Sequence, residues 1–145
     1  MPFEPLPLLI LIDDTGGRCS KVVPRMKALL EHRGFIVSVH RVSDGPVDVR
    51  PFRGIVLGAP TFGVGLKDLP PTDALADYLD QLEDIDEKQI AVFTVYPAWP
   101  GNSLERLKGL VLRLGAQFVA WHGYPLANLE KGEHVIPTEC MVRIR

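Results

Sequence analysis

The sequence has few of the residues that build disulfides or zinc sites. Among its 145 residues only two are cysteines, Cys19 and Cys140, and its four histidines are scattered between residues 32 and 134. Structural zinc sites need cysteines and histidines in closely spaced pairs, so this pattern excludes one. No apolar segment near the N-terminus is long enough for secretion or membrane insertion. Two distant thiols in such a chain predict a reducing, cytoplasmic location.

An excess of positive charge is also missing. The chain has 16 lysines and arginines against 18 aspartates and glutamates, a formal net charge of -2. Binding to nucleic acid or to an anionic membrane surface depends on a basic field. We therefore expect neither nucleic acid nor membrane as a partner.

What the sequence does contain is a series of short, continuously apolar runs. Each is too short for a typical helix and is typical of a strand buried on both faces of a parallel sheet. The runs cover residues 8–12, 35–42, 54–59, 89–96 and, more weakly, 116–122.

Between these runs the apolar residues recur with the period of a helix. Glycine follows two of the three stripes and predicts where those helices end. Asn102 and Glu105 have the spacing of a capping box at the start of the last one, and prolines predict a loop over residues 43–53. The stripes are Val22, Met26, Leu29 and Leu30 before Gly34; Leu75, Tyr78, Leu79 and Leu82; and Leu104, Leu107, Val111 and Leu114 before Gly115.

Alternating strands and helices predict an α/β fold, an open parallel sheet with helices on both faces. The length fits one domain. Residues 124–145 show no helical stripe and are expected to form an irregular tail of the same domain, which begins at residue 1 and extends to 123. Three helices leave part of one face bare, which predicts a homodimer or a longer chain with a downstream domain.

Ligands of such sheets bind at the carboxyl ends of the strands. The loops that leave those ends cover residues 13–20, 58–65 and 96–102. The first has two glycines and opens a helix, so its backbone amides are suited to an anion. The other two supply a hydroxyl group and aromatic rings.

Over residues 8 to about 122 the chain resembles the flavodoxin family. The resemblance rests on the order and spacing of four pieces: TGG at residues 15–17, GAPTFG at 58–63, PP…YLDQL at 70–82, and AVFTVY…PGNSLERLKGLVLRLGA at 91–116. It implies a flavodoxin-like fold with strand order 2-1-3-4-5. It also implies noncovalent FMN, used for electron transfer with a redox partner protein.

Carried over position by position, the resemblance implies a set of FMN-binding residues. The first loop surrounds the phosphate, the second follows the flavin and the ribityl chain, and an aromatic ring of the third covers the flavin ring. The residues are Thr15, Gly16, Gly17 and Arg18; Pro60, Thr61, Phe62 and Gly63; and Tyr96 or Trp99, with Gly101 letting the backbone approach.

Three residues depart from the family's pattern. Asp13 and Arg18 stand where it usually has hydroxyl residues, so a carboxylate repels the phosphate while an arginine attracts it. Asp13 is alternatively a helix cap. Pro24 costs about 3 kcal/mol inside a helix that begins at Gly16, and little in one that begins at a Ser20 cap.

Three functions follow. The first is an FMN-binding electron carrier, the second an NAD(P)H-dependent FMN reductase of quinones or flavins, and the third an interaction module that has kept the fold and lost the flavin. Cys19 has no histidine or second cysteine near it and is assigned no role. The acidic residues from Asp68 to Glu87 are expected to form a solvated face, which in such carriers steers basic partners.

Overall fold

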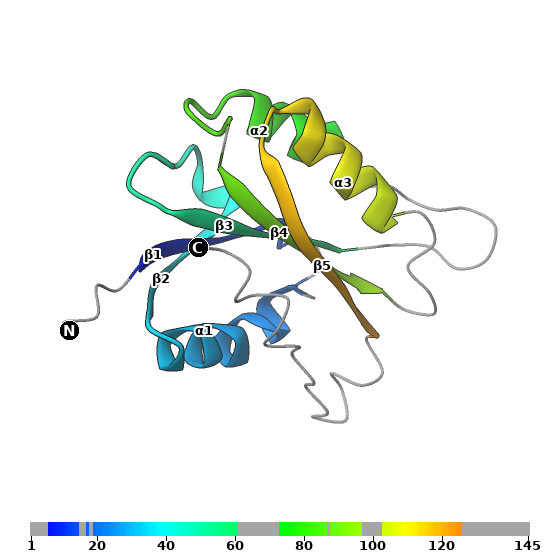
Figure 1. Ribbon diagram of the computed structural model, residues 1–145. Helices are drawn as coiled ribbons and strands as arrows, with labels where there is room; N and C mark the ends of the chain where they lie inside the picture. Colours follow the sequence, from blue (N-terminus) through cyan, green and yellow to red (C-terminus); the bar gives the residue numbers. More distant parts are fainter. Residues whose placement is uncertain are drawn as a thin grey trace.

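The computed structural model describes residues 6–14, 17, 19–60, 73–86, 88–96 and 103–125. Five strands form a single sheet in which every pair is parallel, in the order β2-β1-β3-β4-β5 (Figure 1). The predicted α/β fold and strand order are confirmed. The strands are β1 (Leu6–Ile12), β2 (Phe35–Arg41), β3 (Gly54–Pro60), β4 (Gln89–Tyr96) and β5 (Gln117–Pro125).

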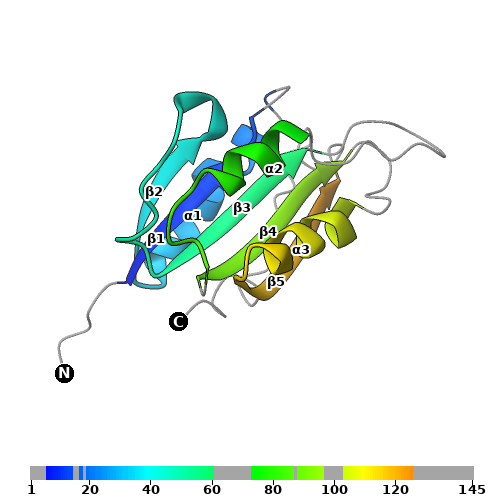
Figure 2. The ribbon, with the colours of Figure 1, turned by 90° about the horizontal axis from the view of Figure 1, so that it is seen from above.

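Within the described residues three helices cover the sheet, α1 (Val23–His32), α2 (Asp73–Asp80) and α3 (Ser103–Arg113). α1 lies on one face, and α2 and α3 lie side by side on the other (Figures 1 and 2). The sheet and the helices on its two faces thus form three layers, as the alternating pattern predicts.

The apolar run of β1 explains why both faces are covered. Leu8, Ile10 and Ile12 pack in the cluster that contains Met26 and Leu30 of α1. Leu9 and Leu11 point the other way, into the cluster with Leu75 and Leu79 of α2 and Leu107 and Val111 of α3. Since successive side chains of a strand alternate between faces, a polar residue at any of these positions would enter a core. Each fully buried leucine or isoleucine contributes roughly 1.5–3 kcal/mol.

The first helix begins later than the family pattern implies. A short 3-10 turn, η2 (Cys19–Lys21), precedes it, and α1 begins at Val23. Pro24 therefore lies in the first turn, where its missing N–H would have no helical partner in any case. The predicted Ser20 cap is wrong, because the N-cap position is Val22 and no side chain caps it.

The crossover from β2 to β3 is a loop, as its prolines predict. It starts with a second 3-10 turn, η3 (Val42–Asp44), and contains no helix. Tyr78 Oη of α2 donates to the carbonyl oxygen of Gly45 at 2.8 Å, and His40 Nε2 donates to the same oxygen at 2.7 Å. Phe35 and Val37 of β2 pack with α1, so Ile36 points to the other face, and because no crossover helix covers β2 there, Ile36 stays 55% exposed.

The fifth strand is longer than predicted, since it continues past residue 122 to Pro125. Tyr124 is buried, and its ring meets that of Phe93 edge to face with centroids 5.9 Å apart. The two residues at the start of the predicted tail are therefore strand residues, and residues 126–145 lie outside the described residues.

Ala91, Phe93 and Val95 of β4, on the α1 face, are fully buried. The α1 face of β4 is therefore covered. The homodimer or the longer chain with a downstream domain, which was inferred from a bare face, stays a prediction.

Candidate functional site

The candidate site lies where the parallel strands end. β3 and β4 point to the same edge of the sheet, next to the end of β1 (Figure 2). Of the predicted FMN-binding residues, the structure describes Gly17, Pro60 and Tyr96, all at this carboxyl edge. The other predicted residues lie outside the described residues: Thr15, Gly16, Arg18, Thr61, Phe62, Gly63, Trp99 and Gly101.

The loop after β1 is tied to the neighbouring strand at its first residue. The backbone N–H of Asp13 donates to the carbonyl oxygen of Gly58 at 2.8 Å, and Asp13 is only 6% exposed. Asp13 does not cap α1, whose N-cap position is Val22. The hydrogen bond extends the pairing of β1 with β3 and fixes where the loop leaves the sheet.

Gly17 has the conformation that a tight loop needs. Its φ of +71° lies in the left-handed region, which residues with a Cβ rarely adopt. Its N–H donates to the carbonyl oxygen of Asp14 at 2.9 Å. This amide is therefore used inside the turn, while the space around the glycine is open.

Asp14 is held from two sides by side chains. Ser20 Oγ donates to Asp14 Oδ1 at 2.5 Å. Arg41 Nε lies 3.3 Å from Asp14 Oδ2, with the Asp14 side chain 23% exposed and that of Arg41 51% exposed. The guanidinium thus compensates one of the two carboxylates that follow β1.

Arg41 is the residue of this site that the sequence reasoning missed. It is the last residue of β2, and the parallel register places it beside Ile12, the last residue of β1. The predicted strand order 2-1-3-4-5 makes β1 and β2 neighbours but leaves their register open. Aligning the carboxyl ends of the first two apolar runs, as an additional step, would have brought Arg41 to the carboxyl edge.

Pro60 and Tyr96 end the two central strands on the other side of the site. Pro60 is buried and pairs in register with Val95, and Tyr96 is half-buried and pairs with Pro125. The structure thus brings the start of the second predicted loop next to the start of the third. One aromatic ring, that of Tyr96, is in place at the end of β4.

Two other residue types singled out in the sequence lie elsewhere. Cys19 is fully buried in the core beside α1. The described acidic residues in and after α2 are exposed, as predicted for a solvated face. They are Asp77, Asp80, Glu83, Asp84 and Asp86.

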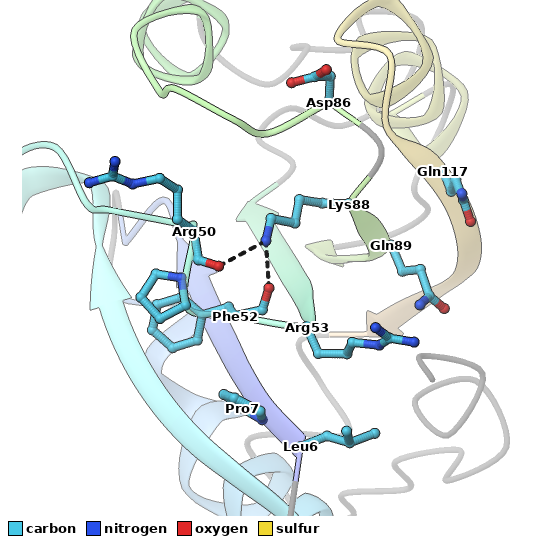
Figure 3. A pocket seen from close by; sticks show the side chains of 10 residues that line it. Leu6, Pro7, Arg50, Phe52, Arg53, Asp86, Lys88, Gln89 and Gln117 are labelled. Atoms are coloured by element: carbon cyan, nitrogen blue, oxygen red, sulfur yellow. Dashed lines mark hydrogen bonds between the residues drawn. The ribbon is translucent and has the colours of Figure 1, made fainter.

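A cavity of about 590 Å³ lies at the opposite edge, where the strands begin (Figure 3). The Lys88 side chain lines this cavity, and its Nζ donates to the carbonyl oxygens of Arg50 at 3.2 Å and Phe52 at 2.7 Å. The guanidinium of Arg50 donates to Asp48 at 2.9 and 3.0 Å and so holds the pKa of that carboxyl below its ordinary value. Lys88 and Arg50 thus fix the loop that precedes β3 through these hydrogen bonds. Asp86 lines the same cavity, so this acid is remote from the carboxyl edge.

Two kinds of feature were searched for in the described part of the chain and are not found there. It contains no group of three or more His, Cys, Asp or Glu side chains arranged to hold a metal ion. None of its helices is both long and apolar enough to span a membrane.

Comparison with known proteins gives matches in structure alone. No protein-family model matches the chain, and no curated protein matches it. The fold is similar to that of oxidised flavodoxin 2 from Bacillus cereus, with a TM-score of 0.66 and 17% identity over 94% of this chain and 97% of that one.

Two further solved structures resemble it. Two-electron reduced flavodoxin from Megasphaera elsdenii has a TM-score of 0.65 and 19% identity, covering 81% of this chain and 85% of that one. Flavodoxin from Fusobacterium nucleatum, bound to flavin mononucleotide, has a TM-score of 0.59 and 15% identity, covering 77% and 68%. The chain therefore has a flavodoxin-like fold.

Proposed function

We propose, from this flavodoxin-like fold, that the chain binds FMN noncovalently at the carboxyl edge and acts as an electron carrier for a redox partner protein in the cytoplasm. The observation that supports it most is the convergence of the ends of β1, β3 and β4 at one edge of a sheet ordered β2-β1-β3-β4-β5. Ligands of open parallel sheets bind where the strand order reverses, here beside β1 and β3.

The described residues fit such a ligand in three respects. Gly17 has the left-handed conformation of a tight anion-binding turn. The charge of Asp14 is compensated by Arg41. Tyr96 offers a half-buried ring, and stacking on a flavin contributes about 1 kcal/mol beyond the buried area.

In the proposed site each loop has one task. Thr15, Gly16, Gly17 and Arg18 would bind the phosphate, Pro60 to Gly63 would line the flavin and ribityl chain, and Tyr96 or Trp99 would cover the ring beside Gly101. FMN itself supplies the electron uptake and release. The protein would shield the ring from water and adjust its potential through nearby charges.

The first test is the visible spectrum of the freshly purified protein, followed by titration with FMN. We expect a flavin spectrum and saturation at one FMN per chain. A colourless protein that remains so in excess FMN would refute the proposal. Bleaching of the bound flavin by NAD(P)H alone would instead favour the reductase activity.

A pair of glycine variants tests whether binding depends on the first loop. Gly17 and Gly45 both have positive φ, +71° and +95°, and both have open space where a Cβ would lie. Alanine at either position costs roughly 1–2 kcal/mol of backbone strain. We expect Gly17→Ala to weaken FMN binding and Gly45→Ala, in the β2–β3 loop, to leave it unchanged.

The second candidate function is an interaction module without flavin. It is favoured by the Gly17 N–H, which already donates to the Asp14 carbonyl and so is not directed to a ligand. FMN titration separates the two functions, because the module would show no binding even when Asp13 is replaced by Ser.

A further inference from the structure

Two carboxylates follow β1, beside the loop proposed for the phosphate. Asp13 is buried at 6% exposure, and the Asp14 side chain is 23% exposed. A phosphate monoester carries between one and two negative charges at neutral pH, so it is repelled by carboxylates a few ångströms away. A phosphate at this edge therefore needs a cation that offsets them.

Arg41 supplies that cation from another strand. Its Nε lies 3.3 Å from Asp14 Oδ2, and the register of β1 with β2 places Arg41 beside Ile12. Ser20 Oγ donates to the other oxygen of Asp14 at 2.5 Å. The carboxylate is thus held in place by a neutral donor and neutralised by a charged one.

The geometry leaves Arg41 donors for a second anion. A guanidinium has five N–H donors, and Asp14 is contacted through Nε. The Arg41 side chain is 51% exposed at the same edge. Half of the Arg41 side-chain surface is thus open to solvent, so an oxyanion can approach the guanidinium while the ion pair with Asp14 persists.

We propose that Arg41 makes the carboxyl edge selective for a phosphorylated flavin over the same flavin without its phosphate. The inference rests on the proposed function and goes beyond it by assigning phosphate selectivity to a residue outside the three loops. Ser20 acts as a positioning residue, because it fixes the carboxylate to which Arg41 is paired.

The test compares two ligands that differ only in the phosphate. The dissociation constants of FMN and riboflavin are measured by fluorescence quenching for the wild type, Arg41→Gln and Arg41→Lys. Arg50→Gln is the matched control, because it makes the same charge change at the opposite edge. We expect Arg41→Gln to weaken FMN binding about tenfold, with riboflavin unchanged, an intermediate loss for Arg41→Lys, and none for Arg50→Gln.

Each other outcome is decisive. Equal losses for FMN and riboflavin would show that Arg41 only supports the loop, and unchanged FMN affinity would show that it has no role. Both results overturn the inference while leaving FMN binding intact. If the wild type binds neither ligand, the proposed function itself fails. Recovery of FMN affinity when Asp14→Asn is added to Arg41→Gln would confirm that the carboxylate is the source of repulsion.

Discussion

Gly58 of β3 lies directly against the ring of Phe93 in β4. A Cβ built on Gly58 would lie 2.7 Å from Phe93 Cε2 and closer still to Cζ and Cε1, nearer than real Cβ atoms approach. Both residues are buried, and they pair in the parallel register of the two central strands. The glycine thus makes room for the largest fully buried side chain among the described residues.

Alanine at Gly58 is therefore expected to destabilise the fold. The ring is buried on all sides and has little room to withdraw, so overpacking of Gly58→Ala should lower the free energy of unfolding by about 2–3 kcal/mol. Urea denaturation measures this. Gly109→Ala is the control, since nothing lies within 4 Å of its Cβ position in α3, and it should stabilise the protein slightly. Adding Phe93→Leu should recover part of the loss; if it does not, the clash is not the cause.

The β2–β3 loop should depend on Tyr78. Its hydroxyl donates to the Gly45 carbonyl from α2, and burial raises the pKa of Tyr78 above its ordinary value. Tyr78→Phe should cost about 1 kcal/mol of unfolding free energy. Amide hydrogen exchange should increase in residues 42–53 and not in α3. Uniform exchange changes across the sheet would contradict this local role.

Lys88 should hold the other end of the same loop. Its ammonium joins the start of β4 to the carbonyls of Arg50 and Phe52, as Figure 3 shows. Lys88→Met keeps the chain length of the stem and removes both hydrogen bonds, so we expect a loss of about 1–2 kcal/mol in urea denaturation. Arg50→Gln, which breaks only the exposed pair with Asp48, should change stability by less than Lys88→Met does.

The fold was predictable because its signals are local. The run from Leu8 to Ile12 is apolar at every position, which a strand satisfies only between two covered faces. The stripe with Met26 and Leu30, ended by Gly34, similarly fixes a helix and its buried side. The end of β5 was missed, since Gly123 and Pro125 indicate a turn, whereas pairing with β4 and the burial of Tyr124 outweigh that preference.

The site was less predictable because its contacts are not local. The ion pair of Asp14 with Arg41 joins residues on two strands, and only the register brings them together. Serine is a residue type that often caps helices, and Ser20 was expected to do so. Ser20 instead lies in η2, before the start of α1, and its hydroxyl donates to Asp14. Asp13 was expected either to repel the phosphate or to cap the first helix; it does not cap α1, and its backbone N–H donates instead to the carbonyl oxygen of Gly58.

The stability of the protein should fall in mild acid because of His122. This β5 ring is partly buried and meets Tyr124 edge to face with centroids 4.6 Å apart, and burial lowers its pKa from the ordinary 6.5. As the pH falls below 6.5, the unfolded state takes up the proton first, so the free energy of unfolding decreases until His122 titrates in the folded state as well. The stabilising contribution is thus complete above pH 6.5 and is lost below it. Urea denaturation from pH 8 to pH 5 measures the slope, and both His122→Phe and His122→Gln should flatten it. A wild-type slope retained in both variants would assign the effect to other groups.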